Sequence, residues 1–188
     1  MSLRWFADWL DTHAWSTALH ESLYMYPYIE TTHVLGLTLF VGTLAIVDLR
    51  MLGYAYRTTP ISTISQSVLP WTVIGFVIMF TTGLLLFYAI PVRTYHSVWF
   101  RIKVIMIVLA AINAAHYHYR ISKNRILWDT SPKPPRSVRM TAAASLFLWV
   151  VVIFTGRMIA YNWFDCDRPQ PDWVITIAGC VLDEVASL

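Results

Sequence analysis

Four long stretches of mostly apolar residues follow one another along this chain, separated by short polar connections. They cover residues 28–50, 68–90, 98–119 and 141–163. Each has about the 20 residues that an α-helix needs to cross the hydrocarbon core of a bilayer. Because backbone groups in lipid must be satisfied within the segment, such stretches are helical. The pattern predicts an all-α integral membrane protein built as a four-helix bundle.

The two ends of the chain differ from these spans. Residues 1–25 carry Trp, Phe and Leu at helical spacing among acidic residues and histidines, which predicts an amphipathic helix lying in the membrane interface. We expect residues 26–163 to form the bundle and residues 164–188 to form a small extracytoplasmic tail. The two cysteines, Cys166 and Cys180, both fall in this tail, where they form a disulfide or remain free thiols.

Composition supports a membrane protein. Hydrophobic residues make up 57% of the chain, the mean hydropathy is +0.53 and only 13% of residues are charged. A typical soluble protein has about 25% charged residues. The net charge of +3 is small and its basic residues are scattered, so nucleic acid is not an expected partner, whereas the lipid bilayer is.

The basic residues instead predict the orientation. The connections after the first and third spans carry eight Lys and Arg, counting Arg50 at the end of the first span, and the opposite side carries three outside the spans. By the positive-inside bias these two connections face the cytoplasm. We therefore expect a multi-pass membrane protein with both termini on the extracytoplasmic side.

One group of ionisable residues lies near the outer ends of three spans. Glu30 and His33 open the first span, Lys103 lies early in the third, and Arg157 lies late in the fourth. Arg101 is at the same depth, on the other side of its helix from Lys103. Ionisable residues in a span usually face the protein interior and have a function.

Three interpretations of this outer group are open. Glu30 can pair with Arg157 or Lys103 in a buried ion-pair network, because buried charges need partners. Alternatively, His33 is an axial ligand of haem b and the basic side chains neutralise the haem propionates. The third interpretation is a copper-like metal site, with the ligands His33, Glu30 and His20.

A second group lies about 20 Å deeper by helical rise, near the inner surface. Its members are Asp48, Arg50, Asn113, His116 and His118. Asp48 and Arg50 are close enough in the sequence to pair with each other or with the loop that follows the first span. His116 is the second candidate haem ligand, with a separate cofactor because of its distance from His33.

Short motifs resemble an uncharacterised bacterial family of four-helix membrane proteins. They are YPxxExxHxxG and DLRxxG in residues 26–53, and GRMIAY, a GRxIAY motif, in residues 156–161. A more distant resemblance to the HemJ protoporphyrinogen oxidases involves His33, Gly42 and Arg50, together with Trp99 and Lys103. The CopD copper-resistance proteins have a similar first helix. The HemJ resemblance implies haem b bound by His33, with Lys103 in the same pocket.

The sequence thus predicts a haem-b-binding membrane protein engaged in electron transfer, with His33, His116, Lys103, Arg157 and Arg101 as cofactor-binding residues. Quinone or a periplasmic redox partner would exchange the electrons, and the chain is expected to form an oligomer or join a complex. The alternatives are metal handling or transport, a non-catalytic anchor subunit, and a HemJ-like oxidase. No catalytic residue is assigned.

Overall fold

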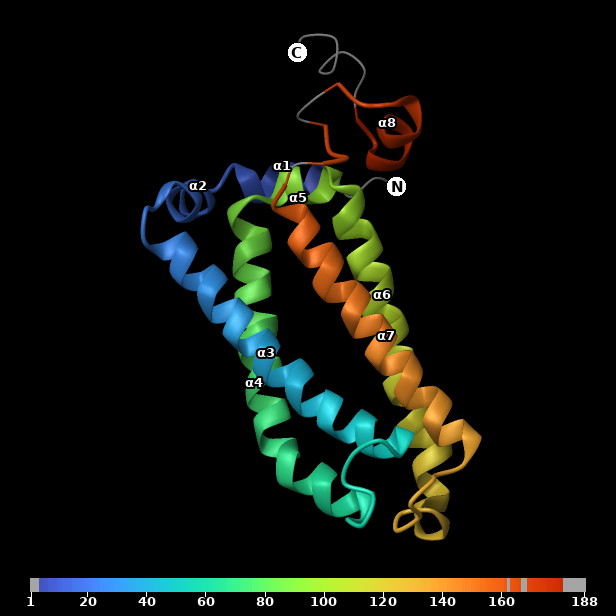
Figure 1. Cartoon of the computed structure of the whole chain (residues 1–188). Helices are drawn as coiled ribbons and strands as arrows, with labels where there is room; N and C mark the ends of the chain where they lie inside the picture. Colours follow the sequence, from blue (N-terminus) through green and yellow to red (C-terminus); the bar gives the residue numbers. More distant parts are fainter. Residues whose placement is uncertain (1–3, 162, 167–168, 181–188) are drawn as a thin grey trace. The chain divides into compact units, whose positions relative to one another are not determined.

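The computed structural model describes residues 4–161, 163–166 and 169–180, and this part of the chain is all-α. Figure 1 shows the helices in chain order. They are α1 (Arg4–Asp11), α2 (Ala14–Glu21), α3 (Met25–Leu52), α4 (Ile61–Ala89), α5 (Pro91–His96), α6 (Val98–His116), the π-helical η1 (Tyr117–Ile121), the 3₁₀-helical η2 (Ser122–Leu127), α7 (Arg136–Ile159) and α8 (Asp172–Ala178).

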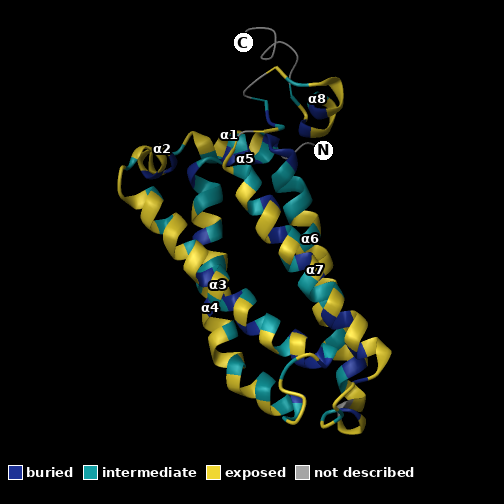
Figure 2. Cartoon of the chain, viewed as in Figure 1, coloured by how far each residue is buried: buried dark blue, intermediate teal, exposed yellow. Residues whose placement is uncertain are grey.

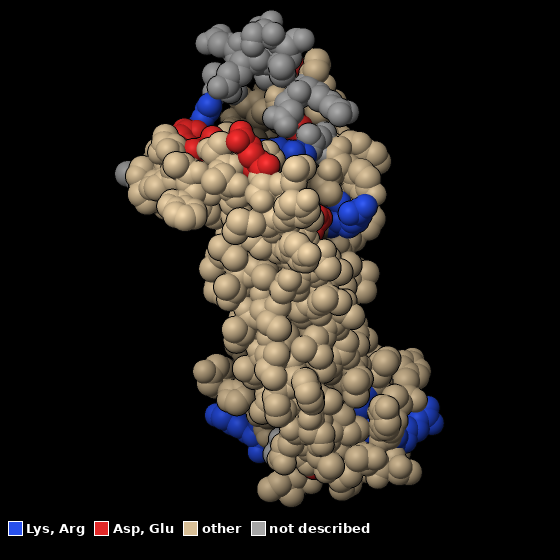
Figure 3. All heavy atoms as spheres, turned by 90° about the vertical axis from the view of Figure 1, so that its left-hand side faces the viewer, with Lys and Arg blue, Asp and Glu red and all other residues tan. Residues whose placement is uncertain are grey.

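Four helical segments are long and apolar enough to cross a membrane: Met25–Leu52, Ile61–Ala89, Val98–Asn124 and Arg136–Ile159. Large apolar side chains on these segments are exposed, as lipid-facing helices require (Figure 2). On the face drawn in Figure 3, the charged side chains lie over helix ends and loops and not along the spans. The predicted all-α multi-pass membrane protein is therefore confirmed.

Several helix boundaries differ from the predicted ones, and two of these differences have a local cause in the structure. The second span begins at Ile61 instead of residue 68, because Asp129 caps its first turn: the carboxylate accepts the backbone N–H of Ser62 at 2.8 Å and its hydroxyl at 2.5 Å. The single helix expected over residues 1–25 is two helices, since His13 has extended backbone (φ −81°, ψ 127°) between α1 and α2. Residues 1–3, 162, 167–168 and 181–188 of the predicted segments lie outside the described residues.

The chain divides into two compact units. The first unit comprises Met1–Thr31, Thr81–Ile105 and Val152–Leu188. Within it α1 packs against α5, and the hydroxyl of Ser16 in α2 donates to the carbonyl oxygen of Tyr88 in α4 at 2.7 Å. The two short N-terminal helices are thus tied to the end of the second span, and their position in the membrane interface stays a prediction.

The second unit comprises Thr32–Phe80 and Met106–Val151. Its parts of α3 and α4 meet backbone to backbone. A Cβ atom added to Gly75 would lie 2.7 Å from the backbone nitrogen of Phe40, and one added to Gly36 would lie 3.0 Å from that of Met79. Small residues allow such close helix contacts in membranes, where helix association depends on van der Waals packing. The hydroxyl of Thr72 donates to that of Thr43 at 2.9 Å in the same contact.

Candidate functional site

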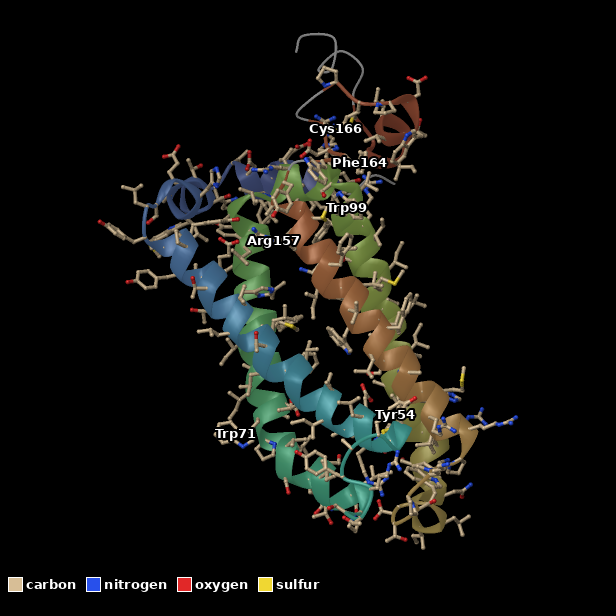
Figure 4. All side chains as sticks on the ribbon, viewed as in Figure 1. Tyr54, Trp71, Trp99, Arg157, Phe164 and Cys166 are labelled. Carbon is tan, nitrogen blue, oxygen red and sulfur yellow. A yellow bond between two sulfur atoms is a disulfide. The ribbon has the colours of Figure 1, made fainter. Side chains whose placement is uncertain are left out.

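Two hydrogen-bond donors lie one helical turn apart near the start of α6. Trp99 and Lys103 are separated by four residues, so their side chains share one face of the helix. Both side chains are half-buried, and the indole Nε1 of Trp99 is fully buried. We call these two groups the donor pair. Figure 4 labels Trp99 at this end of α6.

Neither member of the donor pair has an acceptor in the described part of the chain. The Nε1–H of Trp99 has no hydrogen-bond partner, and no described carboxylate or carbonyl oxygen contacts the ammonium of Lys103. A buried donor left without an acceptor costs about 1–3 kcal/mol, and more when it is charged. A ligand that carries hydrogen-bond acceptors would therefore stabilise the indole N–H of Trp99 and the ammonium of Lys103, which lie on one face of α6.

Aromatic rings and a glycine surround the donor pair in the first unit. The indole of Trp99 makes an edge contact with Phe154 in α7, with ring centroids 6.0 Å apart, and lies 5.8 Å from the ring of Phe164. A Cβ atom added to Gly156 would lie 3.6 Å from Nζ of Lys103. The absence of a side chain at this glycine keeps space beside the ammonium, and the aromatic rings provide apolar walls.

The expected ion-pair network does not form among the described residues. Glu30 is exposed and makes no ion pair with Lys103 or Arg157. The guanidinium of Arg157 donates to the hydroxyl of Tyr161 at 3.3 Å and stacks over the ring of the same residue at 5.1 Å. The positive charge of Lys103 is therefore not neutralised by the acid that the sequence suggested for it.

Arg101 and His96 contact the C-terminal end of α8. The guanidinium of Arg101 donates to the carbonyl oxygens of Ile177 and Ala178, the latter at 2.7 Å. Nδ1 of the buried His96 lies 3.1 Å from the carbonyl oxygen of Ala178. Because a carbonyl oxygen only accepts, Nδ1 is the donor in this contact. Arg101 thus caps α8 in the part of the tail that the structure describes.

The tail also contains a disulfide. Cys166 and Cys180 are joined by a bond of 2.03 Å, so the disulfide alternative is the one observed. The bond closes a segment that contains α8, whose Val174 and Ala178 form a small core with Val98 of α6. The tail therefore has an ordered part that packs on the start of the third span.

The inner group of residues lies in the second unit and is largely satisfied by the protein. Arg50 is fully buried, and its guanidinium donates to the carbonyl oxygens of Thr59 at 2.8 Å and Ser131 at 3.1 Å. Asp48 is buried near Ser145, which provides one hydrogen bond, and its Oδ2 has no partner. Arg50 therefore pairs with the loops and not with Asp48.

The remaining candidate residues are spread over several helices. Asn113 donates to the carbonyl oxygen of Thr141 at 3.1 Å, and His116, one turn later, is exposed. His33 is half-buried in α3, and His20 is exposed in α2 with its ring 6.0 Å from that of Tyr26. No group of three or more His, Cys, Asp or Glu side chains placed to hold a metal ion occurs in the described residues. The roles of His33, His116 and Glu30 as ligands stay predictions.

A protein-family profile matches most of the chain. Its description is "Family of unknown function (DUF6644)", and the match covers residues 9–162. The chain belongs to this family. The DUF6644 region includes Trp99, Lys103 and Gly156, whereas the disulfide and α8 follow it. Comparisons with curated proteins and with solved structures found no match. Membership agrees with the expected uncharacterised family, and the HemJ and CopD similarities stay predictions.

The sequence assigned Lys103 to the site, whereas Trp99 entered only through the HemJ resemblance and was not among the predicted cofactor-binding residues. The Trp-x-x-x-Lys spacing is the signal that points to both members of the donor pair, because residues four apart lie on one helical face. Gly156 carries no signal of its own, since its role depends on which residue of α6 approaches it.

Proposed function

We propose that the donor pair binds the carboxylates of haem b, and that this DUF6644 protein carries electrons within the membrane. The observation that supports the proposal is that the unpaired Nε1–H of Trp99 and the ammonium of Lys103, which is unpaired among the described residues, belong to residues one helical turn apart on α6. Ionisable residues in a span are costly and typically functional. A ligand with carboxylate oxygens and a large apolar body would satisfy both donors and contact the aromatic walls.

The residues of the first unit fit this cofactor. A haem propionate accepts hydrogen bonds and carries negative charge, which is the complement of an indole N–H and an ammonium. An imidazole for the iron is available as well, since the Nδ1–H of His96 donates to a carbonyl oxygen and leaves Nε2 as the coordinating nitrogen. Metal-bound histidines commonly have such a backbone partner. His33 remains the first candidate ligand on sequence grounds.

In this proposal each side chain has a distinct task. Lys103 neutralises a carboxylate, and Trp99 fixes the position of that carboxylate through one directed hydrogen bond. Gly156 leaves room for the group that the ammonium holds. When bound, haem b supplies a one-electron iron couple whose potential depends on the surrounding charges and hydrogen bonds.

We propose the bacterial inner membrane as the location, with both termini on the periplasmic side, from the distribution of Lys and Arg in the loops. The donor pair then lies near the periplasmic surface. Quinone in the bilayer or a periplasmic redox protein would exchange electrons with a cofactor held there.

An optical spectrum of the detergent-purified full chain tests the proposal. We expect a b-type reduced-minus-oxidised band. Lys103→Met and Trp99→Phe should each weaken cofactor retention, the former about tenfold, because each removes a hydrogen bond to a charged group. Lys103→Arg should restore part of the loss.

Two matched variants control for general damage. Trp71→Phe changes an exposed tryptophan of α4, and Lys133→Met removes an exposed loop cation, so neither should alter the band. The absence of any b-type band would refute haem binding. A band that is unchanged in both donor-pair variants would place the cofactor elsewhere in the chain.

A further inference from the structure

A cleft of about 380 Å³ lies in the second unit, between the end of the third span and the start of α7. Its polar lining residues are Arg120, Asn124 and Ser137, and no acidic residue lines it. Its apolar lining residues are Ile121, Leu127, Trp128 and Pro135. The cleft therefore combines hydrogen-bond donors with an apolar wall.

The local chain conformation creates this cleft. The third span ends in a π-helical turn, closed by the hydrogen bond from the N–H of Ser122 to the carbonyl oxygen of Tyr117, and continues in the 3₁₀ segment η2. Asn124 departs from helical geometry, with φ −101° and ψ 22°. These turns direct successive side chains away from the α-helical path, and π-helical turns occur frequently at functional sites.

Buried residues hold the cleft in place on both sides. Ile121 and Trp128 belong to a hydrophobic core with Met51 of α3 and Val138 of α7. Next to Trp128, the carboxylate of Asp129 caps α4, and its backbone carbonyl oxygen accepts the N–H of Ile61 at 3.1 Å. The walls are therefore fixed by packing before any ligand binds, which lowers the entropic cost of binding.

Charge and exposed apolar surface together indicate the ligand. Two exposed basic residues are chain neighbours of lining residues: Lys123 precedes Asn124, and Arg136 lies between Pro135 and Ser137. Beside them the apolar side chains of Ile126 and Leu127 are 94% and 84% exposed. Water is a poor environment for these two side chains, whereas acyl chains and a lipid interface are favourable.

We infer that this cleft binds the phosphate headgroup of an anionic phospholipid. The guanidinium of Arg120, the amide of Asn124 and the hydroxyl of Ser137 donate to the phosphate oxygens, and the acyl chains lie along Leu127. Basic pockets at the cytoplasmic ends of membrane helices bind such headgroups. The site is independent of the donor pair, which lies in the other unit.

Native mass spectrometry of the full chain in neutral detergent tests the inference with phosphatidylglycerol, phosphatidylcholine and glycerol 3-phosphate as probes. We expect phosphatidylglycerol to bind at least about tenfold more tightly than the other two. Arg120→Gln should remove about tenfold of this affinity, and Ser137→Ala should lower it less. Both side chains lie at the surface, so the fold should be retained, which tryptophan fluorescence verifies.

Arg139→Gln is the matched control, because Arg139 is exposed in the first turn of α7 but is not one of the lining residues of the cleft. An equal loss in Arg120→Gln and Arg139→Gln would show a general surface-charge effect and overturn the site. Equal binding of phosphatidylcholine would overturn headgroup selection. Binding of glycerol 3-phosphate as tight as that of phosphatidylglycerol would assign the cleft to a soluble phosphate ester and overturn the lipid.

Discussion

The buried guanidinium of Arg50 joins the two loops of the second unit, and its removal should destabilise the protein strongly. The side chain is fully buried, and it donates to the loop carbonyl oxygens of Thr59 and Ser131 at 2.8 and 3.1 Å. A third contact, to the carbonyl oxygen of Asp129, is 3.5 Å long and contributes less. We therefore predict that Arg50→Gln loses two hydrogen bonds from a charged donor.

The magnitude follows from these contacts. A hydrogen bond to a charged group contributes about 1.5–3 kcal/mol, so Arg50→Gln should lower the free energy of unfolding by about 3 kcal/mol or more. For a chain of 150–250 residues, each kcal/mol corresponds to roughly 2–4 °C in the melting temperature. We expect a decrease of about 6–12 °C. Arg50→Lys should lie between the wild type and Arg50→Gln, because an ammonium reaches fewer of these carbonyl oxygens.

The measurement is thermal unfolding of the purified protein in detergent, followed by intrinsic tryptophan fluorescence. Arg57→Gln is the matched control: Arg57 is exposed in the same connection, and among the described residues its guanidinium donates only to the carbonyl oxygen of Gly53, at 2.5 Å. It should shift the melting temperature by far less. If the two glutamine variants melt at the same temperature, the hydrogen bonds of Arg50 to the loops do not stabilise the fold.

Three further predictions concern the helix contact, the disulfide and the orientation. Gly75→Ala should destabilise the protein by about 1–3 kcal/mol in the same melting assay, because its Cβ would lie 2.7 Å from a backbone nitrogen, whereas Gly42→Ala, with open space around it, should be neutral or stabilising. An equal effect of the two would refute the close contact. Cys166→Ser should speed protease cleavage of the tail without lowering the melting temperature of the spans, since the disulfide closes only the segment around α8; unchanged cleavage would contradict this. Fusions of a periplasm-dependent reporter should be active at either terminus and inactive in the loop of residues 128–135, and the opposite result would reverse the proposed topology.

The donor pair shows how far a site can be read from the sequence. The spacing of Trp99 and Lys103 indicates a shared helical face, and the cost of a cation in a span indicates a function. The acceptor that was expected for Lys103 was Glu30, and the structure does not provide it among the described residues. Pairing between helices depends on rotation and depth, which periodicity alone does not specify.

The loops show more clearly that the sequence pattern does not specify tertiary contacts. Asp129 carries no motif, yet its carboxylate determines where α4 begins, 67 residues away from it along the chain. The cleft at Arg120 depends on a π-helical turn that follows an ordinary apolar span. The cap of α4 arises from a contact between segments distant in sequence, and the apolar pattern of the third span gives no indication of the π-helical turn.

The sequence by itself determined that this is a multi-pass all-α membrane protein, because crossing a bilayer requires only length, apolar composition and internally satisfied backbone. It also placed the ionisable residues at two depths, since helical rise is constant. The tertiary structure alone decided which of these charged groups have hydrogen-bond acceptors. Arg50 donates to loop carbonyl oxygens and Arg101 to carbonyl oxygens at the end of α8, whereas Lys103 donates to no described group. The physical reason is that a buried charge is stabilised by whichever oxygen atoms folding brings within hydrogen-bond distance, and that distance is a property of the packed chain.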